Sequence, residues 1–142
     1  MNAVIDASVL IKFYVPEIFF DRAEELFDKV ENGEILLIAP DLIYPETGNI
    51  LWKKHRSKEL ILSEVKEILE GILSIPIKIE PSKPLLQLAI ELGLAYKITV
   101  YDALYMAIAQ IYGSKLITAD KKLTGLLKNT PLESHVAWLG NM

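Results

Sequence analysis

Ile35-Leu36-Leu37-Ile38 is an uninterrupted run of apolar residues, followed two positions later by Pro40. Strands with one face in water alternate apolar and polar residues, whereas strands covered on both faces do not, so this run predicts a strand inside a parallel sheet. The helical spacing of apolar residues over Asp21–Asn32 predicts a helix before the strand, with Gly33 as its C-terminal glycine. Another helix is predicted after the strand, over Asp41–His55.

The same alternation of strand and helix continues along the whole chain. Ser63 is expected to cap a further amphipathic helix, and Ser82 with Pro84 is expected to open one that closes at Gly93. Alternating strands and helices indicate an α/β fold, in which a parallel sheet carries helices on both faces. The remaining predicted elements are strands at Val4–Ile5, Ile77–Ile79, Lys115–Thr118 and Val136–Leu139 and helices at Val9–Tyr14, Thr99–Tyr112 and Lys121–Lys128.

The composition provides enough apolar residues for a buried core. The 142 residues, 51% of them apolar, are expected to form a single domain spanning 1–142. The absence of cysteine excludes disulfides, thiolate metal sites and a cysteine nucleophile. No apolar run reaches the roughly 18 residues of a membrane span, and the first residues lack the basic region of a signal peptide. We therefore expect a cytoplasmic protein with no membrane partner.

The net charge of −4 limits the ways in which this chain can bind nucleic acid. It argues against a protein that coats nucleic acid through a general basic surface. It does not argue against a nuclease, because divalent ions would neutralise the carboxylates that bind them.

Three aspartates have an ordinary structural explanation. Asp6 and Asp120 each follow a predicted strand and precede a predicted helix, which is a typical place for a helix N-cap. Asp102 lies three residues after Thr99 and so completes a Thr-x-x-Asp capping box. Considered singly, these residues do not require a functional role.

Glu46 is harder to explain structurally. It shares a helix face with Leu42 and Ile50, which should face the sheet. Burying an unpaired carboxylate costs roughly several kcal/mol, so something must compensate its charge. Lys53 and Lys54 lie toward the exposed end of the helix, so a metal ion is a more economical partner than a core salt bridge.

Considered together, the four acids indicate a metal site. Ligands of open parallel sheets bind at the carboxyl ends of the strands, where Asp6 and Asp120 are predicted to lie. Oxygen ligands without cysteine suit Mg²⁺ or Mn²⁺ better than zinc. Such ions can activate water and stabilise the leaving oxygen of a phosphodiester.

Four segments in order resemble the four motifs of the PIN domain family, and of its VapC-type members in particular. Pro45–Leu51 is similar to the Glu-x-x-Asn-x-Leu motif, and Tyr101–Ala109 is similar to Asp-Ala-x-x-x-Ala-x-Ala. Val4–Leu10 resembles the first motif and Leu116–Leu123 resembles the fourth, Leu-x-Thr-x-Asp-x-x-Leu. The resemblance runs from Asn2 to about Leu139, essentially the whole chain.

The resemblance implies a fold and an activity. The fold is a three-layer PIN-like α/β fold, with a central parallel sheet of about five strands in the order 3-2-1-4-5 flanked by helices. The activity is that of an endoribonuclease, the toxin of a toxin–antitoxin pair, which hydrolyses RNA with water activated by Mg²⁺ or Mn²⁺. Thr118 would hydrogen-bond a metal ligand or a bound water. The implied metal ligands are Asp6, Glu46, Asp102 and Asp120.

The resemblance also implies partners. These are an RNA substrate, a cognate antitoxin protein and a second copy of the chain in a homodimer, for which the apolar helices before Ile77 are the candidate interface. Lys121 and Lys122 follow the fourth motif, where some members carry a further acid. Among the properties that the resemblance implies, binding of a second metal ion therefore has the weakest support in this sequence.

Other interpretations remain open. The basic residues between Lys53 and Lys58 either complement the dipole of a solvated helix end or contact phosphates. A PIN fold kept only for binding, without activity, is an alternative function. An aspartate-based phosphatase or phospho-acceptor is a weaker one, because aspartyl phosphatases usually need an acid two residues after the first aspartate and Ser8 stands there.

Overall fold

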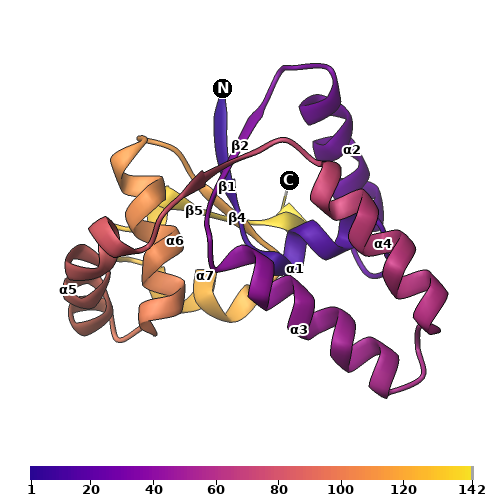
Figure 1. Cartoon of the computed structure of the whole chain (residues 1–142). Coiled ribbons are helices and arrows are strands. Elements are labelled where there is room, and N and C mark those ends of the chain that lie inside the picture. The colour runs from indigo at the N-terminus through magenta and orange to yellow at the C-terminus, as the bar shows by residue number, and fades with distance from the viewer. Residues whose placement is uncertain (142) are drawn as a thin grey trace.

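Five parallel strands form one sheet in the order β3-β2-β1-β4-β5, which confirms the expected architecture (Figure 1). The computed structural model describes residues 1–141, and Met142, the last residue of the predicted single domain, lies outside them. The strands are β1 (Asn2–Ile5), β2 (Leu36–Pro40), β3 (Ile77–Glu80), β4 (Leu116–Thr118) and β5 (Val136–Trp138).

Helices cover both faces of this sheet. On one face α6 packs against β1, β2 and β4, and α5 packs on α6, while α1 to α4 lie on the other side (Figure 1). Short 3₁₀ turns occur at Ile11–Phe13, Lys83–Leu85, Glu133–His135 and Leu139–Asn141. The helices are α1 (Ala7–Leu10), α2 (Phe20–Glu31), α3 (Ile43–Arg56), α4 (Leu62–Ser74), α5 (Leu86–Tyr96), α6 (Val100–Ile111) and α7 (Lys121–Leu127).

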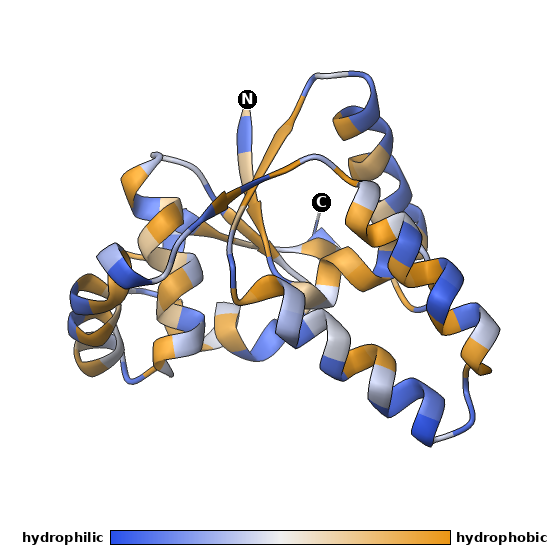
Figure 2. Ribbon diagram, viewed as in Figure 1, coloured by the Kyte–Doolittle hydropathy of each residue, from blue (hydrophilic) through white to orange (hydrophobic). Residues whose placement is uncertain are grey.

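The core lies where the sheet meets α6. Strands β1 and β2 are buried beyond their first residues, and α6 is buried without interruption from Ala103 to Ala109. A helix that is apolar all round must be enclosed, which explains why α5 covers its outer side. Figure 2 shows the matching hydrophobic colour along the central strands. Within residues 1–141, no helix is both long and apolar enough to cross a membrane.

The strand order changes direction between β1 and β4. The chain proceeds from β1 outward to β2 and β3, then returns to place β4 on the other side of β1 and β5 beyond it. The register pairs Val4 with Leu116 and Ile5 with Ile117. The residues after Ile5 and Ile117 therefore emerge side by side at the switch point, where open α/β sheets bind their ligands.

Two predicted helix ends are wrong. The N-cap of α4 is Ile61, not Ser63, and the Glu64 carboxylate accepts the Ile61 backbone N–H at 3.0 Å, so an acid inside the first turn replaces the expected hydroxyl. Gly93 does not close α5, which continues to Tyr96. Gly93 instead lets the backbone of Ile98 lie close to α5, because a Cβ at position 93 would lie 3.0 Å from the carbonyl oxygen of Ile98.

Candidate active site

All four carboxylates predicted as metal ligands line one pocket of about 260 Å³ at the carboxyl end of the sheet. Each stands at the start of a different helix: Asp6 and Asp120 are N-caps, and Glu46 and Asp102 lie in first turns. For Asp6 and Asp120 the structural and the functional explanations therefore hold together, because the same side chains cap helices and face the pocket. The pocket is lined by Asp6, Ala7, Ser8, Glu46, Asn49, Ile50, Asp102, Tyr105 and Asp120.

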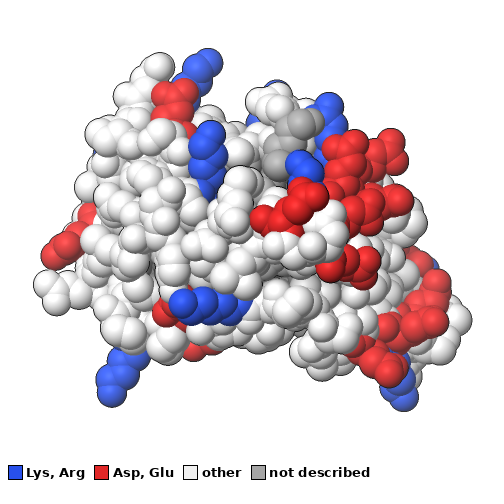
Figure 3. Space-filling model, turned by 90° about the horizontal axis from the view of Figure 1, so that it is seen from above, with Lys and Arg blue, Asp and Glu red and all other residues white. Residues whose placement is uncertain are grey.

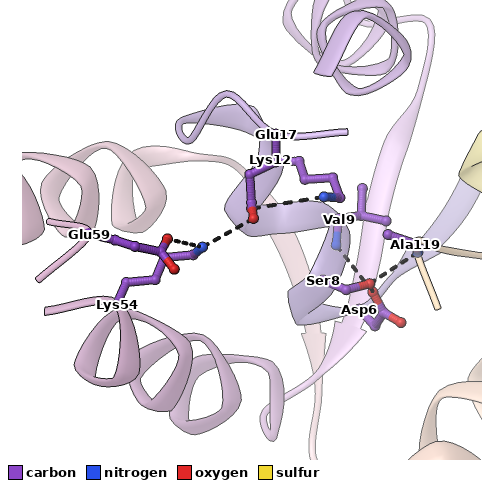
Figure 4. Close-up of polar contacts among 8 residues, drawn as sticks. All are labelled: Asp6, Ser8, Val9, Lys12, Glu17, Lys54, Glu59 and Ala119. Atoms are coloured by element: carbon purple, nitrogen blue, oxygen red, sulfur yellow. Dashed lines mark hydrogen bonds and ion pairs between the residues drawn. The ribbon is translucent and has the colours of Figure 1, made fainter. Parts of the chain in front are cut away.

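Asp6 is the most tightly held of these carboxylates. Its Oδ1 accepts the backbone N–H of Val9 at 3.2 Å, which is the N-cap of α1, and the hydroxyl of Ser8 at 2.5 Å (Figure 4). Its Oδ2 accepts the hydroxyl of Thr118 at 2.5 Å. Two donors from α1 and one from the end of β4 thus fix the orientation of this carboxylate.

Thr118 and Ser8 join the ends of β1 and β4. The fully buried Thr118 hydroxyl donates to Asp6 and accepts the backbone N–H of Asp120 at 3.0 Å. The Ser8 hydroxyl similarly accepts the backbone N–H of Ala119 at 3.0 Å. The register of β1 with β4 makes both contacts possible, and spacing along the sequence alone could not predict them.

Glu46 has a partner that the sequence did not reveal. The hydroxyl of Tyr105, on α6, donates to its Oε1 at 2.5 Å. Tyr105 is buried, and Glu46 is partly buried beside it. A tyrosine hydroxyl therefore supplies part of the compensation that we expected from a cation.

Asp102 and Asp120 complete the rim of the pocket. The Thr99 hydroxyl caps α6 by accepting the Asp102 backbone N–H at 3.1 Å, which confirms the predicted helix start. Asp120 caps α7 by accepting the Lys122 backbone N–H at 2.9 Å and is exposed. Asp120 is thus the most solvated of the four carboxylates.

Three carboxylates of this pocket, those of Asp6, Glu46 and Asp102, have raised pKa values. Burial raises the pKa of Asp6 to about 6 against the opposing hydrogen bonds of Ser8, Thr118 and Val9, and the charge of Glu46 adds to the rise. Burial also raises the pKa of Glu46 and of Asp102, each with a smaller contribution from a neighbouring carboxylate. Such mutual repulsion is what a bound cation would relieve.

The donor set fits a hard divalent cation. Carboxylate and hydroxyl oxygens line the pocket, and no histidine does. In the part of the chain described, however, no three acidic or histidine side chains already form a group that could hold an ion. The convergence of Asp6, Glu46 and Asp102 on one ion therefore stays a prediction, since Asp6 is directed toward hydroxyls and Glu46 toward Tyr105.

The excess negative charge is concentrated elsewhere. Figure 3, which looks onto the amino-terminal end of the sheet, shows acidic side chains gathered on one side of the molecule. A cluster on α2 contributes to the net charge of −4 without facing the pocket. This cluster comprises Asp21, Glu24, Glu25 and Asp28.

Comparisons with known proteins agree with this geometry. Residues 3–126 match the sequence model of the PIN domain. Over 125 residues the chain is 34% identical to Ribonuclease VapC3 of Pyrobaculum aerophilum, covering 87% of this chain and 92% of that protein. Over 106 residues it is 35% identical to Exonuclease VapC9 of the same organism, covering 72% and 75%. A toxin–antitoxin complex from Klebsiella pneumoniae contains a similar fold, with a TM-score of 0.63, 16% identity and 95% of each chain covered.

Proposed function

The chain belongs to the PIN domain family and is of the VapC type, and on that premise we propose that it is a metal-dependent endoribonuclease that acts as the toxin of a toxin–antitoxin pair. The observation that carries the proposal is the gathering of Asp6, Glu46, Asp102 and Asp120 around one pocket at the switch point of the sheet. The name of the ribonuclease relative supports RNA as the substrate.

Asp6, Glu46 and Asp102 would hold one Mg²⁺ or Mn²⁺, and Asp120 would contribute to a second position. When bound, such an ion supplies positive charge that makes a water nucleophilic and stabilises the leaving oxygen of the phosphodiester. The carboxylate oxygens of the lining and the raised pKa of Asp6 support a cation of this class.

The protein side chains prepare the site for that chemistry. Ser8 and Thr118 hold the Asp6 carboxylate in one orientation, so little reorganisation is needed when substrate arrives. Tyr105 does the same for Glu46. The exposed Asp120 leaves one side of the pocket open to solvent and to RNA.

We extend the proposal to the partners. The toxin–antitoxin complex with the same fold supports a cognate antitoxin. A homodimer is proposed from the family resemblance, with α3 and α4 as the candidate interface, where Trp52, Leu62 and Leu73 are exposed. A toxin that cuts cellular RNA would act in the cytoplasm. We also propose that residues 1–142 form one domain.

Cleavage of purified RNA with Mn²⁺, with and without EDTA, tests the proposal. We expect cleavage that EDTA abolishes. Because one relative is named an exonuclease, a circular RNA should be compared with its linear form. Cutting of the circle identifies an endonuclease, and cutting of the linear form alone would replace that part of the proposal. No cleavage of either RNA, with RNA or antitoxin still bound, would indicate the alternative of an inactive binding module.

A further inference from the structure

A second pocket lies directly beside the candidate active site. Its volume is about 280 Å³, and it shares Ser8, Ile50 and Asp120 with the first pocket. Its other lining residues come from the beginning of the chain, from α3 and from the end of β4, namely Ile11, Lys12, Glu17, Lys54 and Ala119. The second pocket thus continues the surface on which an RNA strand would lie if the proposed function is correct.

Two lysines of this second pocket are unusually buried. The side chains of Lys12 and Lys54 are only 12% and 11% exposed. Lysine side chains are normally solvated, and a buried one needs an anionic partner. Burial lowers the pKa of Lys54, but hydrogen bonds and the charges of Glu59 and Glu17 more than offset this effect, so the pKa is raised and the side chain is a cation.

Glu17 lies between the two lysines. Its Oε1 is 3.9 Å from the Lys12 Nζ and its Oε2 is 3.1 Å from the Lys54 Nζ (Figure 4). Glu17 belongs to the segment between the 3₁₀ turn at Ile11–Phe13 and α2, and its own side chain is 34% exposed. The Lys54 Nζ also lies 3.1 Å from the Oε2 of Glu59, whose side chain is 60% exposed. The anions are therefore the accessible members of the group, and Glu17 is the one that both lysines share.

We propose that the second pocket binds a phosphate of the RNA strand next to the one being cleaved, and that this phosphate takes the place of the Glu17 carboxylate between Lys12 and Lys54. The proposal rests on the proposed ribonuclease function. Both anions carry one negative charge and oxygen acceptors, so either satisfies the two ammonium groups. Ile11 and Ile50 offer apolar surface to the sugar or base beside that phosphate.

A purely structural role for this ion-pair group makes a different prediction. If the group only joins the Lys12 turn to α3, removing any member should lower stability and leave RNA binding unchanged. If Glu17 competes with RNA, removing Glu17 and removing a lysine should change RNA affinity in opposite directions. The sign of the Glu17 effect therefore distinguishes the two roles.

The experiment measures binding of a short fluorescent single-stranded RNA in EDTA and steady-state cleavage with Mn²⁺. We expect Lys54→Met and Lys12→Met each to weaken binding about tenfold and to reduce the salt dependence of binding by about one counterion. Glu17→Gln should tighten binding several-fold, and Lys54→Arg should retain it. These changes should appear in KM, with kcat near that of the wild type.

Matched controls remove the same charges at the opposite end of the sheet. Lys115 precedes β4 and Glu34 precedes β2, so Lys115→Met and Glu34→Gln should leave RNA binding unchanged. Weaker binding of Glu17→Gln would overturn the phosphate site. Unchanged binding of Lys12→Met, Lys54→Met and Glu17→Gln, each shown to be folded by its melt, would also overturn it. Absence of cleavage by the wild type would instead count against the proposed function, and the binding series in EDTA would still decide the role of the lysines.

Discussion

Tyr105 and Glu46 lie 59 positions apart in the sequence, and the phenolic hydroxyl of the first donates to the carboxylate of the second at 2.5 Å. The contact ties α6 to α3 across the candidate active site. Burial raises the pKa of Tyr105, and its hydrogen bond to Glu46 raises the pKa further, so the hydroxyl is a permanent donor near neutral pH. Tyr105 is therefore a positioning residue for Glu46.

Tyr105→Phe should weaken metal binding more than it slows the reaction. Without the hydroxyl, Glu46 loses the donor that orients it, and loss of such a partner typically costs about 10- to 100-fold in metal affinity. The Mn²⁺ concentration at half-maximal RNA cleavage should rise accordingly, with kcat largely recovered at saturating metal. Tyr112→Phe is the control, because Tyr112 donates to Glu80 outside the pocket. An equal effect of both variants would point to general destabilisation.

Asp6→Asn should abolish cleavage while the protein stays folded. Asparagine caps a helix about as well as aspartate, so the contact with the Val9 backbone N–H is retained. Loss of the charge should reduce cleavage on the order of 100-fold or more. RNA cleavage and a thermal melt of the same preparation give both readings. A variant that melts normally and cuts at the wild-type rate would end the nuclease assignment.

The same substitution should change how stability depends on pH in EDTA. Folding raises the pKa of Asp6 from 3.8 to about 6, so the folded protein binds this proton more tightly than the unfolded chain does. The resulting stabilisation is full below pH 3.8 and is lost as the pH rises through about 6. The free energy of unfolding falls by at most about 3 kcal/mol over this range, and contact of the carboxylate with solvent reduces this loss. Asp6→Asn should thus melt above the wild type at pH 7.5 and level with it near pH 4. A constant difference between the two proteins would contradict this assignment.

Divalent metal should stabilise the wild-type protein. An ion that binds only the folded state at a hundred times its dissociation constant contributes about 2.7 kcal/mol. Mg²⁺ or Mn²⁺ should therefore raise the melting temperature, and EDTA should reverse the effect. Asp6→Asn should lose most of this shift. A shift of equal size in both proteins would place the ion elsewhere.

Asp102→Asn and Asp120→Asn should differ in severity. Asp102 is partly buried and its pKa is raised by burial and by the charge of Asp120, whereas Asp120 is exposed at the rim. We expect Asp102→Asn to resemble Asp6→Asn, and Asp120→Asn to retain measurable cleavage. Rates under saturating Mn²⁺ provide the comparison. The opposite ranking would make Asp120 the central ligand.

Local patterns predicted the fold well because its elements have strong local signals. The apolar run before Pro40 forms β2, and Gly33 and Gly113 adopt the left-handed conformation just after α2 and α6. The misassigned helix end at Gly93 shows the limit of such signals. A glycine that ends a helix and a glycine that admits a neighbouring carbonyl look alike in sequence.

The sequence predicted which carboxylates belong to the candidate site, but it did not predict the hydrogen bonds and ion pairs that these and neighbouring residues make. Motif resemblance and strand-end positions identified Asp6 and Asp120, because the switch point follows from the strand order. The partnership of Glu46 with Tyr105 depends on how α3 and α6 cross, which spacing along the chain does not encode. The burial of Lys54 was missed for the same reason, since Glu17, one of its two carboxylate partners, lies 37 positions away.

Because Asp6 and Asp120 are helix N-caps as well as pocket residues, a substitution there can reduce cleavage and leave folding intact. An aspartate that becomes asparagine at position 6 or 120 still starts its helix, so natural selection on stability alone would not remove such a change. A lineage relieved of the need to cut RNA would be expected to drift quickly into a folded, inactive descendant. Such a descendant would keep the surfaces that bind other proteins. A nuclease of this kind can therefore evolve into a protein that only binds its partners.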